Sequence, residues 1–320
     1  MSTLTSTILS ASLLIPGTTK PTNSPNNQLL FHKNDHYLNR IVTQKKRASF
    51  FIKAQAQEVE PSVPSSPIIY PTARPKFVLF GSSIVQFSFY EGWGATLAHL
   101  YARQVDVLVR GYSGWNSRAA LRILDKVFPK NAPQQPSLVI VYFGGNDATH
   151  PQPDGNGSHV PLEEYKENMR NIFIHVQSLS EKTRIIFLST PPINEEQLYG
   201  DSIPSDPPKT NESHRIYSEA GLEVSNELNI KSIDLWSAIQ ERSDWKEVSF
   251  IDGIHFTKEG SEVVSRKILK VLKEADWEPS LYWKDMAPEY QEYYTPIGHG
   301  GEPIDESNTR FPPGVEWEPV

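Results

Sequence analysis

The chain has 320 residues, of which 38% are apolar and 22% charged, and it contains no cysteine. This composition is typical of a globular protein, and the lack of cysteine excludes disulfides, thiolate zinc sites and a cysteine nucleophile. The net charge of −7 disfavours a nucleic-acid partner held by electrostatics. No apolar run approaches the roughly 18 residues of a membrane-spanning helix, so we expect no transmembrane segment.

The N-terminal segment differs from the rest of the chain in charge. Residues 1–57 contain seven Lys or Arg and one acidic residue, and eleven of the first 24 residues are Ser or Thr. Such a basic, hydroxyl-rich, acid-poor start is typical of an organelle transit peptide, which predicts import into a chloroplast or other plastid. One alternative is a secretory signal over residues 8–15. The other is a disordered tail without a targeting signal, which would leave the protein cytoplasmic.

The next segment, residues 58–75, carries five prolines and is predicted to be an extended linker. A regular pattern follows over residues 76–276. Short apolar runs, mostly ended by Gly or Pro, predict buried strands at 77–80, 105–109, 137–143, 183–188 and 230–235. Apolar stripes with helical spacing predict helices over 119–127, 165–176 and 263–272.

Buried strands that alternate with amphipathic helices indicate a parallel sheet covered on both faces. We therefore expect one three-layer α/β/α sandwich with a mostly parallel five-stranded sheet. Residues 277–320 are rich in aromatic residues and Pro without a clear period. This C-terminal arm is expected to pack aromatic side chains onto the domain, and the alternative is a partner-binding or lid segment.

Ligands of open parallel sheets bind outside the carboxyl ends of the strands, so the residues after each strand are the candidates for chemistry. Residues 81–84 read Gly-Ser-Ser-Ile, 111–116 read Gly-Tyr-Ser-Gly-Trp-Asn, and 144–147 read Gly-Gly-Asn-Asp. Late in the chain, residues 252–255 read Asp-Gly-Ile-His. Each segment alone is as well explained by a turn or a helix cap, and only their joint order is informative.

Ester hydrolysis needs a nucleophilic hydroxyl, an imidazole base, a carboxylate that orients the imidazole, and donors for the oxyanion. Ser83, His255 and Asp252 can supply the first three. The backbone N–H groups of Ser83 and Gly114, with the side-chain amide of Asn146, can supply the donors. Thr257 is predicted to cap the final helix. No metal or cofactor is expected.

Four of these segments together resemble the sequence blocks of the GDSL or SGNH hydrolases. Residues 80–84 are similar to the first block, 110–116 to the second, 144–147 to the third and 252–255 to the fifth, in family order. Residues 92–94, 111–118 and 277–281 are most similar to the plant isoamyl acetate-hydrolysing esterase-like branch. The resemblance implies a flavodoxin-like fold.

The resemblance also assigns roles. Ser83 aligns with the nucleophile, Gly114 and Asn146 with oxyanion donors, and Asp252 and His255 with the rest of the triad. The Asp of the Gly-Asp-Ser-Leu block is Ser82 here, which creates adjacent hydroxyl groups; the family register favours Ser83.

The sequence thus predicts a serine esterase, a carboxylic ester hydrolase that acts on a small-molecule ester with a short acyl or acetyl group. Alternatives are a carbohydrate O-acetyl esterase or a lipid acyl hydrolase with the same triad, and a catalytically inactive binding protein on the same fold. The sequence identifies no protein partner.

Overall fold

The computed structural model describes residues 74–153, 155–200, 204 and 208–289. The predicted transit peptide, nearly all of the linker and the last part of the C-terminal arm lie outside these residues. All five predicted strands are present: β1 Lys76–Gly81, β2 Asp106–Gly111, β3 Leu138–Tyr142, β4 Arg184–Leu188 and β5 Lys231–Ile233. They form one sheet in the order β2-β1-β3-β4-β5, and every pair is parallel. The predicted fold class is therefore confirmed.

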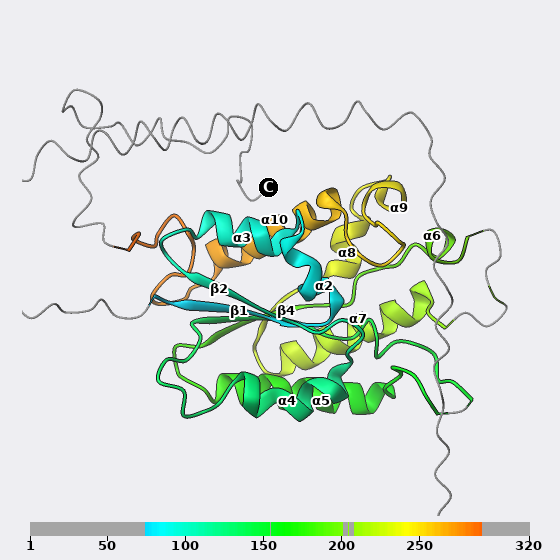
Figure 1. The fold of residues 1–320 in the computed structure, drawn as a ribbon, viewed down its shortest axis with the longest axis horizontal. Coiled ribbons are helices and arrows are strands. Elements are labelled where there is room, and N and C mark those ends of the chain that lie inside the picture. The colour runs from blue at the N-terminus through cyan, green and yellow to red at the C-terminus, as the bar shows by residue number, and fades with distance from the viewer. Residues whose placement is uncertain (1–73, 154, 201–203, 205–207, 290–320) are drawn as a thin grey trace, which may run out of the picture. The chain divides into compact units, whose positions relative to one another are not determined.

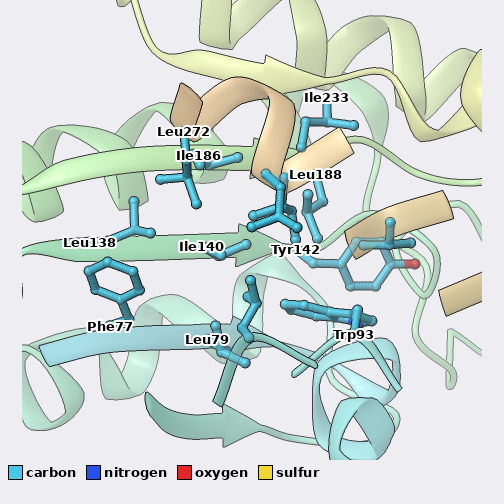
Figure 2. Close-up of a cluster of buried hydrophobic side chains, with 14 of the residues drawn as sticks. Phe77, Leu79, Trp93, Leu138, Ile140, Tyr142, Ile186, Leu188, Ile233 and Leu272 are labelled. Atoms are coloured by element: carbon cyan, nitrogen blue, oxygen red, sulfur yellow. The ribbon is translucent and has the colours of Figure 1, made fainter. Parts of the chain in front are cut away.

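Both faces of the sheet are buried, which explains why its strands are nearly continuous apolar runs. On one face, Phe77 and Leu79 of β1 pack with Leu138 and Ile140 of β3 (Figure 2). The residues between them in sequence point to the opposite core, as the two-residue period of a strand requires.

Helices cover both faces of the sheet (Figure 1). One layer contains α3 (Trp93–Leu100), α8 (Leu235–Gln240) and α10 (Lys258–Glu274). The other layer contains α4 (Ser117–Val127), α5 (Leu162–Gln177) and α7 (Asn211–Glu227). The shorter elements are α2 (Ser83–Gln86), the 3-10 turn η1 (Phe87–Phe89), α6 (Glu195–Tyr199) and α9 (Trp245–Val248). No helix within the described parts of the chain is both long and apolar enough to cross a membrane.

The helix α10 begins as predicted, because the Thr257 hydroxyl accepts the N–H of Gly260 at 3.1 Å. In contrast, α7 has no counterpart among the sequence-based predictions. Its buried side mixes polar and apolar residues, so the apolar spacing is interrupted: Ser213, His214, Tyr217, Ser218, Ala220, Gly221, Val224 and Ser225.

The described start of the C-terminal arm, residues 277–289, packs onto the domain. Leu281 is buried, and its carbonyl oxygen accepts the hydroxyl of Tyr101 at 2.7 Å. The side chain of Gln104 donates to the carbonyl oxygen of Trp283 at 2.9 Å. In this part of the arm, aromatic residues join the core next to α3 and β2.

Candidate active site

The carboxyl ends of three neighbouring strands bring the predicted loops together. Gly81, the last residue of β1, is in register with Gly111 at the end of β2 and with Tyr142 at the end of β3. The segments 81–84, 111–116 and 144–147 therefore leave the sheet side by side at one edge. This is the edge at which open α/β sheets bind ligands.

Ser83 is the first residue of the short helix α2, directly after β1. The residue is 8% exposed, against 3% for Ser82. The main-chain carbonyl of Ser82 accepts the N–H groups of Val85 and Gln86, which makes Ser82 the N-cap residue. Because the first N–H groups of a helix have no acceptor within the helix, the Ser83 N–H is available to a ligand.

The second loop is fastened to α2 by two contacts. A Cβ on Gly111 would lie 2.1 Å from the main-chain nitrogen of Gln86, so only glycine permits this approach of two backbones. In addition, the side-chain oxygen of Gln86 accepts the N–H of Ser113 at 2.8 Å. The position of this loop relative to Ser83 is thereby fixed.

Gly114 and Asn146 lie close together. Gly114 is exposed with φ of +79°, and among the described residues no group accepts its N–H. The Asn146 side-chain amide donates one hydrogen to the carbonyl oxygen of Trp115, the next residue, at 2.8 Å. An amide has two N–H groups, so the second one remains for a ligand.

Asp252 and His255 form a closely bonded pair. Asp252 Oδ2 lies 2.6 Å from His255 Nδ1, and Oδ1 accepts the main-chain N–H groups of Ile254 at 3.0 Å and His255 at 2.8 Å. Burial alone raises the pKa of Asp252, but the hydrogen bonds from His255 and Ile254 outweigh it and hold this pKa below its ordinary value. The carboxylate is thus ionised at neutral pH and directs Nδ1–H, leaving Nε2 free to act as a base.

Two further contacts place this segment. Gly253 has φ of +89°, and a Cβ there would lie 2.6 Å from the carbonyl oxygen of Asn194. The main-chain N–H of Asn194 also donates to the carbonyl oxygen of Gly253 at 2.9 Å. On the other side, the ring of His255 meets the edge of the Phe87 ring, with centroids 5.2 Å apart. Phe87 follows α2 directly, so the imidazole lies beside the helix that begins at Ser83.

A cavity of about 470 Å³ adjoins Gly114. It is open to solvent and is lined mainly by residues of the second loop, of the start of α4 and of one further loop: Gly114, Trp115, Asn116, Arg118, Ala119, Arg122, Gly157 and Ser158. Its polar and cationic lining contrasts with the exposed phenyl ring of Phe87 beside His255.

Several residues behind the third loop were not singled out from the sequence. Asp147 is fully buried, and its Oδ1 accepts the main-chain N–H and the hydroxyl of Ser117 at 2.9 and 2.5 Å. Burial raises the pKa of Asp147 to about 6. Lys209 and His214, from the distant segment 208–214, also reach this loop. Motif spacing carries no signal for such contacts, because they depend on how α7 packs against the sheet.

The family is shown by comparison with known proteins. The family model of the GDSL-like lipases and acylhydrolases matches residues 77–268. The chain is 53% identical to the GDSL esterase/lipase WDL1 of Oryza sativa subsp. japonica over 77% of this chain and 96% of that protein. It is 33% identical to the isoamyl acetate-hydrolyzing esterase 1 homolog of Bos taurus, over 68% of this chain and 90% of the relative.

A solved structure agrees with the fold. The lipase/acylhydrolase from Enterococcus faecalis superposes with a TM-score of 0.51 at 21% sequence identity, covering 67% of this chain and 98% of that one. The chain belongs to the GDSL-like lipase and acylhydrolase family, and it is a carboxylic ester hydrolase.

Proposed function

We propose that the protein is a serine esterase in which Ser83 is the nucleophile, His255 the general base and Asp252 the residue that orients the imidazole. The bond of 2.6 Å between Asp252 and the Nδ1 of His255 carries this proposal, together with the contact of His255 with Phe87 beside α2. A carboxylate on Nδ1 sets the imidazole tautomer that accepts a proton at Nε2.

The reaction follows from these roles. His255 Nε2 takes the proton of the Ser83 hydroxyl as its oxygen attacks the ester carbonyl carbon. The carbonyl oxygen becomes negative and accepts hydrogen bonds from the N–H groups of Ser83 and Gly114 and from the free amide hydrogen of Asn146. Each such donor is worth roughly 3 kcal/mol of barrier lowering. The alcohol leaves with the proton from His255, and a water molecule then repeats the sequence on the acyl-enzyme.

The nucleophile is tested by covalent labelling with an organophosphonate, followed by sequencing of the labelled peptide. We expect the label on Ser83, and a loss of at least about a thousandfold in kcat for Ser83→Ala. Ser82→Ala is the matched control, because it removes the neighbouring hydroxyl without touching the proposed nucleophile. A label on Ser82, or equal rates for Ser83→Ala and the unaltered protein, would overturn the assignment.

The surroundings of His255 favour a substrate with a short apolar group. Phe87 contacts the imidazole and is exposed, and the exposed Ile251 donates its N–H to the carbonyl oxygen of His255 at 2.8 Å. Exposed apolar side chains beside a catalytic group bind the apolar part of a ligand. The proposed substrates are therefore esters with a short acyl or acetyl group on an apolar alcohol.

A second candidate is a carbohydrate O-acetyl ester, which the polar cavity beside Gly114 favours. Arg122 in this cavity offers donors that suit hydroxyl-rich or acidic sugars, whereas the guanidinium of Arg118 is bound to the carboxylate of Glu164. A substrate panel separates the two candidates: alkyl acetates, acetylated oligosaccharides and long-chain acyl glycerols, compared by kcat/KM. Preference for acetylated oligosaccharides by tenfold or more would favour the second candidate, and preference for acyl glycerols a lipid acyl hydrolase.

The predicted transit peptide stays a proposal, since residues 1–57 lie outside the described residues. The basic, hydroxyl-rich composition of this segment supports import into a plastid. Mass spectrometry of the mature N-terminus tests it, because an intact Met1 on the native protein excludes import with cleavage.

A further inference from the structure

The main-chain carbonyl groups of the turn that carries Asn146 do not all bind the same kind of donor. Its residues 144–147 have four main-chain carbonyl groups. Three accept main-chain N–H groups from nearby in the sequence: Gly144 from Ala148 at 2.8 Å, Asn146 from Thr149 at 3.2 Å and Asp147 from Val160 at 3.1 Å. The fourth, the carbonyl of Gly145, accepts instead the side-chain amine of Lys209 at 2.5 Å. This carbonyl belongs to the peptide group that joins Gly145 to Asn146.

Lys209 is itself held firmly from both sides. The hydroxyl of Tyr199, at the end of α6, accepts the main-chain N–H of Lys209 at 2.9 Å and donates to its carbonyl oxygen at 2.8 Å. The amine of Lys209 also donates to the hydroxyl oxygen of Thr149 at 2.8 Å. The amine therefore spans the turn, with one bond before Asn146 and one after it.

We propose that Lys209 is a positioning residue for ester hydrolysis, which fixes the Gly145–Asn146 peptide and so directs the Asn146 amide toward the oxyanion. The inference rests on the proposed role of Asn146. A second contact at Gly145 supports it, since a Cβ there would lie 2.7 Å from the hydroxyl of Tyr142. The peptide is thus bound by the amine of Lys209 and has the Tyr142 hydroxyl close to its Gly145 end.

The charge of Lys209 changes near neutral pH. Burial lowers the pKa of Lys209 to about 8, and the charge of Asp147 partly offsets this effect. The titratable groups around the amine are Asp147 on the same turn, His214 on α7, Tyr142 on β3, Tyr199 on α6 and His159, which bonds the carbonyl of Thr149.

The neighbours of Lys209 that have shifted pKa values do not titrate between pH 7 and 9. The pKa of Asp147 is about 6, and burial lowers that of His214 to about 3. Burial raises the pKa of Tyr142 and of Tyr199 above the ordinary value of a phenol. In this range Lys209 loses its charge, and with it the stronger, charge-assisted form of its hydrogen bond to Gly145.

The experiment measures kcat and KM for 4-nitrophenyl acetate between pH 6.5 and 9.5 in the full chain. For Lys209→Met we expect a loss of about tenfold in kcat at pH 7, somewhat less than removal of an oxyanion donor, with KM changed less than twofold. For Lys209→Arg, which keeps a donor that does not titrate in this range, we expect kcat within about threefold of the unaltered protein. The unaltered protein should lose kcat with a midpoint near pH 8, and Lys209→Arg should not.

Thr149→Val is the matched control, because it removes the other acceptor of the amine but leaves the bond to Gly145. It should lower kcat less than Lys209→Met does, because the bond to Gly145 remains. If Lys209→Met does not fold, the pH profiles of Lys209→Arg and of the unaltered protein still test the inference. It is overturned if kcat of the unaltered protein is constant from pH 7 to 9.5, or if both proteins lose kcat equally at alkaline pH.

Asn146→Ala and the double variant separate this inference from the proposed function. Because Lys209 is proposed to act through Asn146, the double variant should be no slower than Asn146→Ala. If the fold-losses in kcat of the two single variants multiply in the double variant, the inference about Lys209 is contradicted, but the proposed function is not. The same holds if Lys209→Met has a normal kcat while Asn146→Ala is slow. A normal kcat for Asn146→Ala contradicts the proposed oxyanion site itself.

Discussion

Gln86 on α2 accepts the main-chain N–H of Ser113 at 2.8 Å, and this bond joins the loop after β1 to the loop after β2. The side chain of Gln86 is exposed, so its removal should leave the core intact. The loop that carries Gly114 would then lose one of its two attachments to the helix that begins at Ser83.

For Gln86→Leu we therefore expect a loss of about fivefold in kcat, as follows from a hydrogen bond worth about 1 kcal/mol. The Tm should fall by only about 2 to 4 °C, because the core is untouched. Gln86→Glu keeps the acceptor oxygen and should retain most of the activity. Equal kcat values for Gln86→Leu and the unaltered protein would show that the Gly111 contact alone suffices.

Two glycines of the second loop should respond differently to an added methyl group. Gly111→Ala places a Cβ 2.1 Å from the main chain of Gln86, and because two backbones must separate, we expect a loss of about 3 kcal/mol or more in the free energy of unfolding. In Gly114→Ala the added Cβ meets no atom within 4 Å, but φ at this position is +79°. This backbone conformation costs an alanine about 1 kcal/mol of folding stability. Urea denaturation of both variants measures this difference, and similar losses would contradict it.

Asp252→Asn tests the orientation of the imidazole. The amide oxygen of Asn can still accept the N–H groups of Ile254 and His255, so the turn and the thermal stability should persist. The tautomer of His255 would no longer be fixed, and we expect a loss of about 10⁴-fold in kcat. Because hydrogen bonds hold the pKa of Asp252 below its ordinary value, this loss should be the same at pH 6 and pH 8. A variant within tenfold of the unaltered rate would argue against the assigned role.

Asp147 should make the protein less stable as the pH rises from 4 to 7. Burial raises the pKa of Asp147 from 3.8 to about 6, so in this interval the unfolded chain releases the proton first. The folded state then pays a growing penalty, up to about 3 kcal/mol at pH 7. Asp147→Asn keeps an acceptor for Ser117 but cannot ionise.

The measurement is the free energy of unfolding at pH 4, 5, 6 and 7 for both proteins. The difference between them should shift in favour of Asp147→Asn as the pH rises. Parallel curves would mean that the buried carboxyl group does not control this dependence.

The sheet could be predicted from the sequence to a large extent, and so could the edge at which three of the candidate segments meet. Apolar runs such as residues 137–143 located every strand, and the stripes on α4, α5 and α10 located those helices. The reason is physical: a strand buried on both faces must be apolar along its length. Since the carboxyl ends of adjacent parallel strands share one edge, the order of the strands then placed three of the four predicted segments together.

The helix α7 and the residues behind Asn146 could not be predicted in this way. The buried side of α7 mixes serine and histidine with apolar residues such as Tyr217 and Val224, so its apolar spacing is weak. Lys209 is 64 residues from Gly145, and no local pattern distinguishes it from a surface lysine. Its role depends on the fold as a whole, and so does the tether from Gln86 to Ser113.

The three hydrogen bonds of Asp252, two to the main chain and one to the imidazole of His255, close a small ring within four residues. Asp252 and His255 are consequently held as one unit, which the rest of the molecule contacts at Gly253 through Asn194 and at the His255 ring through Phe87. A displacement of this segment would change the separation of the imidazole from the hydroxyl of Ser83 but would leave the pair itself intact. Insertions in the neighbouring segments would thus lower or restore the activity by changing this separation, without altering Ser83, Asp252 or His255.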